Sequence, residues 1–251
     1  MSPRDLEPSG LSGVAGRLQQ LVTLAVRDGI GPLTGAVAYA EDRLRRYDGD
    51  SAGPALDRDP DDDVRDAAAA PGSKPAEQAI DRIVWESVLA AGANGFVTGI
   101  GGIVATGAML PANIVGNLVV NARMVGAIAH LRGYELDDPH VRTVITLVVA
   151  GSSAQSAVST VGVKLSEAAG LAAIRSIPIS ALRAINRRAS MALVAKYGTK
   201  RSAITLVRAV PFVGGLAGGG VDAAVTRGVA AGARSAFPAI ERPATGPTPS
   251  L

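Results

Sequence analysis

Cysteine is absent from this chain, and histidine occurs only at His130 and His140. The missing cysteine excludes disulfide bonds and thiolate metal sites, and two histidines are too few for a histidine-rich metal site. We therefore predict neither a metal centre nor a cofactor. The N-terminus lacks the basic start and the apolar run of a signal peptide, which favours a cytoplasmic location.

Aromatic residues make up only 3% of the chain, although hydrophobic residues make up 47%. The core must therefore be filled by Ala, Val, Leu, Ile and Gly, whose small side chains let helices approach closely, especially in membrane bundles. The scarcity of aromatic rings also argues against nucleic acid as a partner, because bases are commonly bound by stacking on such rings.

No catalytic arrangement is present. Residues 151–156 lack the G-x-S-x-G elbow of serine hydrolases, and no paired-carboxylate motif stands out. Asp57, Asp59 and Asp61 resemble the start of a calcium loop, but the glycine and the closing glutamate that such a loop needs are missing. These residues fit a solvated linker, and a non-enzymatic role is favoured.

Charged residues are missing from residues 87–122, 143–163 and 209–221. Such stretches have to be buried, either in protein or in lipid. We predict that the first forms two helices that meet at Pro111, because proline suits the first turn of a helix. Each helix reaches the thickness of a bilayer only when its charged flanks are included.

Hydrophobic spacing of three and four residues predicts helices along most of the chain, with no convincing strand. The expected fold is all-α, a single helical domain with Gly- and Ala-rich apolar helices and an acidic disordered linker. The expected parts are N-terminal helices at 11–46, the acidic linker at 47–74, a helical core at 75–237 and a disordered tail at 238–251.

Local signals place helix ends within the core. Gly133 is expected to cap the end of one helix. Asp138 and Pro139 predict the N-cap and the first-turn proline of the next, which runs to Val149. Further helices are expected at residues 153–169, 179–196, 201–209 and 215–236.

A polar stripe lies in the first uncharged stretch. Asn113, Asn117 and Asn121 are four residues apart and share one face of a helix. These amides either hydrogen-bond between helices or, together with Asp222, line a ligand cavity or a membrane path. An ion pair of Arg123 with Asp222 is a further hypothesis, because a buried charge usually needs a partner. Alternatively, each charge sits at a helix end and reaches water.

Acidic residues are missing from residues 168–221, which carry eight basic residues. With apolar residues interleaved at helical spacing, this pattern favours a basic amphipathic surface that faces anionic lipid. The alternative is a solvated face that balances the acidic linker. The candidate lipid-binding residues are Arg175, Arg183, Arg187, Arg188, Lys196, Lys200 and Arg201.

The order of several motifs is that of a known family. GFVTGIGG at 95–102 is followed by LPANI at 110–114, RGYELDDPHVRT at 132–143 and VPFVGGLAGGGVDAAVTR at 210–227. In this order and spacing the chain resembles the EcsC protein family from about residue 75 to 237. The resemblance implies an all-helical domain.

This chain departs from the family pattern at Asn113, where relatives usually carry an acidic residue. A role that needs a carboxylate at this position is therefore not expected for this chain. The family takes its name from an operon shared with an ABC transporter, which the resemblance therefore implies as a candidate partner. The pattern falls on Pro111, Arg123, Gly133, Tyr134, Asp138, Pro139 and Arg142.

Taken together, the sequence favours a non-enzymatic, membrane-associated helical accessory protein of the EcsC type. Its expected location is the cytoplasm, at the inner face of the membrane, with anionic membrane lipid as a partner. The alternative is a soluble helical protein with a polar-lined ligand pocket.

Overall fold

The computed structural model describes residues 8–51, 70–100, 112–151, 175, 177–198 and 213–240. The described residues are predominantly helical, which confirms the all-α expectation, and the helices predicted at 153–169 and 201–209 lie outside them. The helices are α1 (Pro8–Arg27), α2 (Ala36–Ser51), α4 (Lys74–Ile100), α5 (Ala112–Leu131), α6 (Pro139–Ala150), α9 (Ile179–Leu193), the π-helix η1 (Val194–Gly198) and α10 (Val213–Ala236).

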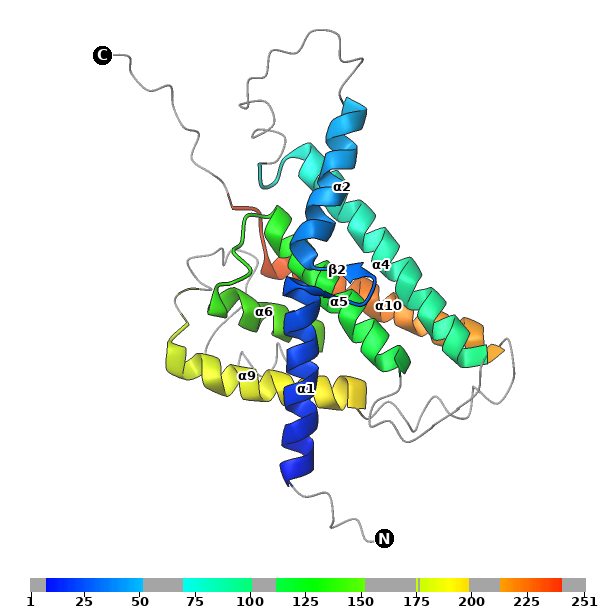
Figure 1. The fold of residues 1–251 in the computed structure, drawn as a ribbon, viewed down its shortest axis with the longest axis vertical. Helices are drawn as coiled ribbons and strands as arrows, with labels where there is room; N and C mark the ends of the chain where they lie inside the picture. Colours follow the sequence, from blue (N-terminus) through cyan, green and yellow to red (C-terminus); the bar gives the residue numbers. More distant parts are fainter. Residues whose placement is uncertain are drawn as a thin grey trace.

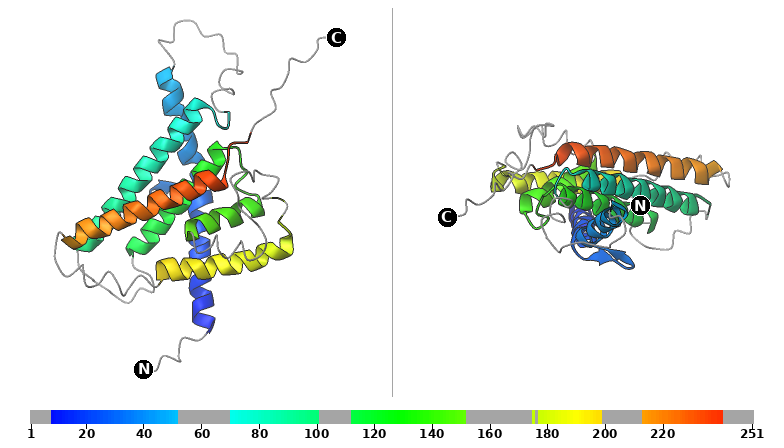
Figure 2. Two further views of the ribbon diagram at one scale, coloured as in Figure 1. Left: turned by 180° about the vertical axis from the view of Figure 1, so that it is seen from behind. Right: turned by 90° about the horizontal axis from the view of Figure 1, so that it is seen from above.

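Helix α5 occupies the centre of the molecule (Figure 1), where it contacts α1, α2, α4, α6 and α10. The view from above in Figure 2 places α10 on one face and α1 and α2 on the other. Helix α9 packs across α1 and α6. An apolar helix that is covered on all sides in this way needs no polar face, which explains the near absence of charge in α5.

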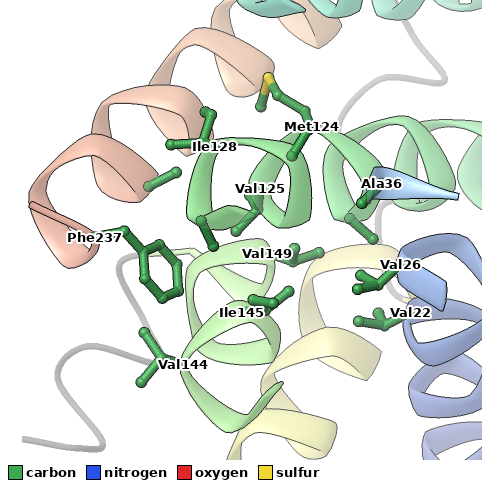
Figure 3. Close-up of a cluster of buried hydrophobic side chains, with 14 of the residues drawn as sticks. Val22, Val26, Ala36, Met124, Val125, Ile128, Val144, Ile145, Val149 and Phe237 are labelled. Carbon is green, nitrogen blue, oxygen red and sulfur yellow. The ribbon is translucent and has the colours of Figure 1, made fainter. Parts of the chain in front are cut away.

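The core around α5 is built from small and branched side chains. Val22 of α1, Val125 of α5 and Ile145 of α6 meet in one cluster (Figure 3). A Cβ atom on Gly126 would lie 2.8 Å from the Cβ atom of Ala36 and 3.3 Å from the methyl groups of Val26. Glycine at this position therefore lets α1 and α2 pack directly on α5.

A short β-ribbon joins α1 to α2, although the sequence predicted no strand. In it β1 (Gly29–Ile30) pairs antiparallel with β2 (Leu33–Thr34). Gly29 has a φ of +86°, and a Cβ atom there would overlap the carbonyl of Leu33. Two residues per strand are too few for an alternating pattern, so only turn residues could have indicated the ribbon.

Helix α2 extends beyond the end predicted for the N-terminal helices at residue 46. It begins at Ala36, after the ribbon, and continues through Ser51 into the segment predicted as linker. Ion pairs four residues apart, Glu41 with Arg45 and Asp42 with Arg46, support its second half. Acidic composition alone therefore did not mark the end of the helix.

The junction between α5 and α6 confirms both predicted caps. Gly133 has a φ of +89°, its N–H donates to His130, and the N–H of Tyr134 donates to Ala129 over 3.0 Å. This pair of bonds is a Schellman motif. Asp138 caps α6 by accepting a 2.8 Å hydrogen bond from the N–H of His140, with Pro139 in the first turn.

Asp138 should make stability depend on pH. Burial alone would raise the pKa of its carboxyl, but hydrogen bonds from His140 and Arg175 outweigh burial and lower the pKa. A carboxyl group whose pKa is lower in the folded than in the unfolded protein stabilises the fold. This stabilisation is complete above the unfolded pKa of about 4, and it is lost as the pH falls through the lower pKa of the folded protein. We expect Asp138→Ala to cost about 1–2 kcal/mol at pH 7 and less at pH 3.

Urea unfolding of the wild type and the variant at both pH values measures this difference. The exposed neighbour Asp137, whose carboxylate lies 3.6 Å from Arg27, provides the control Asp137→Ala, which should have little effect. An Asp138→Ala loss that is equal at both pH values would contradict the lowered pKa.

Candidate functional site

Helices α4, α5 and α10 form a group whose register is fixed by contacts at several heights. Asp81 of α4 accepts a 2.6 Å hydrogen bond from Arg234 of α10, and Gly92 approaches Gly219, so these two helices run antiparallel. Arg132, which directly follows α5, donates to Glu77 and to the carbonyl of Arg234, over 2.9 and 3.1 Å. Helix α5 therefore runs antiparallel to α4 and parallel to α10.

This register brings the ends of two uncharged stretches to one level. Counted from those contacts, Glu86 and Arg123 lie at the same height, and Asp222 of α10 lies about one helical turn beyond them. Beyond them, residues 87–100, 112–122 and 213–221 carry no charge. We call these three segments the uncharged tip. Figures 1 and 2 show that the corresponding ends of α4, α5 and α10 lie at the same side of the molecule, at the lower right of Figure 1.

Large apolar side chains are exposed at and beyond this level. Leu89 is 57% exposed and Val221 is 45% exposed, both within the tip. Trp85, at the charged border, is 54% exposed, and Arg82 stacks over its ring at 4.8 Å. Tryptophan beside a cation, at the height where charge ends, is typical of membrane–water interfaces. In the described part of the chain, every helix is too short or too polar to cross a membrane.

A charged cluster lies at the border of the tip, between α2, α4 and α5. We call Tyr39, Arg43, Arg82, Glu86 and Arg123 the boundary cluster. Glu86 Oε2 accepts hydrogen bonds from the Tyr39 hydroxyl and from Arg43 Nε, both over 2.9 Å, and Oε1 accepts one from Arg82 Nε over 2.7 Å. The guanidinium carbon of Arg123 lies 4.0 Å from the centre of the Tyr39 ring.

The protonation states of this cluster follow from burial and hydrogen bonding. Burial, with a smaller contribution from Glu86, raises the pKa of Tyr39 to about 12. Burial alone would also raise the pKa of Glu86, but the bonds from Arg43, Arg82 and Tyr39 outweigh it and lower the pKa. Glu86 is therefore ionised and Tyr39 neutral at physiological pH. Burial lowers the pKa of Arg123.

The polar stripe of α5 is buried. Asn117 is 8% exposed and Asn121 is 1% exposed, and Asn121 Nδ2 donates to the carbonyl of Asn117 over 2.8 Å. Asn121 precedes Arg132 by eleven residues and so shares the face that contacts α4 and α10. The side chain of Asn113 lies outside the described residues. The stripe therefore faces the seam between the three helices.

Helix α10 contributes polar side chains at the same heights. Asp222 is 9% exposed and Thr226 is fully buried. Together with Asn117 and Asn121 they form what we call the polar seam. Within the described residues, Asn117 Oδ1, Asn121 Oδ1 and Thr226 Oγ1 are buried without a hydrogen-bond partner. Sequence reasoning missed Thr226, although it lies one turn beyond Asp222 on the same helix face.

The hypothesised pair of Arg123 with Asp222 is not formed. Arg123 is two residues beyond Asn121, about 200° further around α5, so it points toward α2 while the asparagines face α10. The groups that act electrostatically on Arg123 are the ring of Tyr39 and the charges of Arg43 and Glu86. The pattern of residues indicated that the charge of Arg123 needs a partner, but it did not indicate the direction of the side chain.

The predicted basic surface is divided by the structure. Arg183, Arg187 and Arg188 are exposed on α9. Arg175 instead donates to Asp138 over 3.1 Å, and Lys196 Nζ donates to the carbonyl of Val149 over 2.7 Å. Lys200 and Arg201 lie outside the described residues.

An exposed stripe on α9 combines charge with apolar surface. Ile179, 69% exposed, and Met191, 48% exposed, lie at its ends, and Arg183 and Arg187 lie between them at intervals of four residues. We call these four residues the α9 stripe. Long cationic side chains that flank exposed apolar ones suit the interface of an anionic membrane.

The remaining residues of the family pattern are mostly structural. Gly133, Tyr134, Asp138 and Pro139 build the α5–α6 junction, and the ring of Tyr134 packs edge-on against Phe237 at 5.0 Å. Arg142 lines a small hollow between α1 and α6. Pro111 lies outside the described residues.

Comparison with known proteins gives a family and no closer match. No curated protein and no solved structure matches the chain. The model of the EcsC protein family matches residues 65–238, which include every described helix from α4 to α10 but neither α1 nor α2. The match begins within the predicted acidic linker and covers well over half of the chain. The chain therefore belongs to the EcsC protein family.

Proposed function

We propose that this protein attaches to the inner face of the cytoplasmic membrane in a non-enzymatic accessory role, with the uncharged tip inserted into one leaflet. The shared border of charge on α4 and α5, with that of α10 about one turn beyond it, carries this proposal. The longest tip segment, residues 87–100, measures about 20 Å as a helix. The hydrocarbon core of a bilayer is about 30 Å thick, so the tip matches one leaflet better than a span.

The α9 stripe supplies a second contact with the same membrane. Arg183 and Arg187 attract anionic headgroups, and Ile179 and Met191 add apolar contact. This contact depends on salt because it is electrostatic, whereas insertion of the tip does not. An ABC transporter is a candidate partner at that surface, from the family's association alone.

Fractionation of the untagged protein tests the proposal. The membrane pellet is washed first with high salt and then with carbonate. Retention through both washes supports insertion of the tip, and release by salt alone would restrict attachment to the α9 stripe. Recovery of all protein in the soluble fraction would contradict membrane attachment.

The second candidate function is a ligand pocket in the polar seam, favoured by its buried oxygens without partners.

The variant Thr226→Val tests whether the seam is empty. If the seam is packed and holds no ligand, the change removes an unpaired buried hydroxyl, and we expect the free energy of unfolding to rise by about 1 kcal/mol. Urea unfolding measures this change. A loss of stability would instead favour a bound small molecule or water in the seam. Thr143, whose hydroxyl donates to Pro139 over 2.8 Å, provides the control Thr143→Val, which should destabilise.

A further inference from the structure

Arg123 is a partly buried cation without a carboxylate partner. Among the described residues, no acidic side chain forms an ion pair with it, and its Nε atom is buried without an acceptor. Glu86 already accepts hydrogen bonds from Tyr39, Arg43 and Arg82. The remaining contact of Arg123 is the face of the Tyr39 ring. The guanidinium is therefore held in place but not neutralised.

The charge balance around Arg123 favours an anion. Glu86 pairs with Arg43 and Arg82, and Asp42 pairs with Arg43 and Arg46, so the two carboxylates are already shared among other arginines and Arg123 adds a positive charge. Stacking on an aromatic ring stabilises a cation by about 0.5–2 kcal/mol, less than the several kcal/mol that desolvation of an ion costs. An anion bound to Arg123 would reduce this excess of positive charge.

We propose that Arg123 binds a phosphate group, and that in the membrane-attached protein this group is the phosphate of a phospholipid headgroup. The second half of this inference rests on the proposed function. Arg123 lies at the border of the uncharged tip, which is the height of the headgroups when the tip is inserted. A planar guanidinium forms two parallel hydrogen bonds to phosphate oxygens, a geometry that an ammonium lacks.

The site joins two parts of the chain. Arg123 and Glu86 belong to the region matched by the family, whereas Tyr39 and Arg43 come from α2, outside it. Tyr39 orients the guanidinium by stacking, and the Arg43 guanidinium carbon lies 4.9 Å from the same ring centre, where it adds positive potential. Helix α2 thus completes a site of which the region matched by the family holds only a part.

Vesicle flotation with matched lipids tests the site. One set of vesicles contains phosphatidylcholine and phosphatidylglycerol, and the other contains galactolipids with a fatty acid that gives the same surface charge without phosphate. We expect the wild type to bind the phospholipid vesicles about tenfold more tightly than the galactolipid vesicles. This ratio corresponds to the contribution of one charge-assisted hydrogen bond. Arg123→Met should abolish this preference. Arg187→Met, which removes an exposed charge, should weaken binding to both sets and keep the preference.

Two further variants separate the site from the fold. Tyr39→Phe keeps the ring and should retain the preference for phosphate, whereas Arg123→Lys keeps the charge but should lose most of it. Thermal unfolding shows whether Arg123→Met is folded, and Arg123→Lys carries the test if it is not. Equal preference for phosphate in the wild type and in both Arg123 variants would overturn the phosphate site and leave insertion of the tip intact.

Titration with inorganic phosphate separates the lipid from a soluble source. If the wild type binds no vesicles, membrane attachment fails and the lipid half of the proposal fails with it. Phosphate binding that is lost in Arg123→Met would then support a site for a soluble phosphate compound. The absence of phosphate binding as well would overturn the whole proposal.

Discussion

Replacement of Arg132 by methionine is expected to lower the free energy of unfolding by about 2–4 kcal/mol, mainly because two carbonyls lose a charged donor. Its side chain is 13% exposed and connects three helices. Its Nη1 atom donates to the carbonyls of Arg234 and Phe237. These carbonyls lie at the C-terminal end of α10, where carbonyl groups have no partner within the helix. Its Nη2 atom donates to Glu77 of α4. Methionine keeps the apolar stem but leaves these acceptors unpaired.

Urea unfolding of the purified protein measures the loss. Arg45, 69% exposed and 4.0 Å from Glu41, provides a control in which Arg45→Met should change stability by less than about 0.5 kcal/mol. Glu77→Gln should reproduce only part of the Arg132→Met loss, since both carbonyls keep their donor. A loss below about 1 kcal/mol for Arg132→Met would mean that water replaces the guanidinium.

Features that depend on neighbouring residues were predicted from the sequence. The caps at Gly133 and Asp138 are set by local backbone geometry and by a proline one position away. The role of Arg132 was not predicted, because its acceptors on α10 lie more than a hundred residues along the chain. No pattern around Arg132 indicates which carbonyls it will reach.

The candidate sites divide in the same way. The uncharged stretch 87–122, which Glu86 and Arg123 border, was recognised from the sequence, but the sequence did not show that these two residues lie at one height. That follows from the register of three helices, which is fixed by long-range contacts. Tyr39 was missed for the same reason, since it reaches Glu86 across 47 residues. Periodicity gives the face of a helix, and packing decides which faces meet.

A glutamate in place of Leu89 is expected to weaken vesicle binding about 30- to 150-fold, from the cost of about 2–3 kcal/mol for a charged side chain within the hydrocarbon region. Leu89 is the most exposed large apolar residue described in the tip. It lies close to the border of charge, so it enters the bilayer only if the tip is inserted. Vesicle flotation with phosphatidylcholine and phosphatidylglycerol measures the change.

Gln78 provides the matched control because it is exposed on the same helix, eleven residues earlier and thus on nearly the same face as Leu89, but outside the tip. Gln78→Glu adds the same charge and should change binding by less than about twofold. Equal losses in the two variants would indicate repulsion from anionic lipid rather than insertion. The variant Leu89→Lys separates these two explanations. If the tip only lies on the anionic surface, the added lysine should strengthen vesicle binding. If the tip is inserted into the lipid, the lysine should weaken vesicle binding.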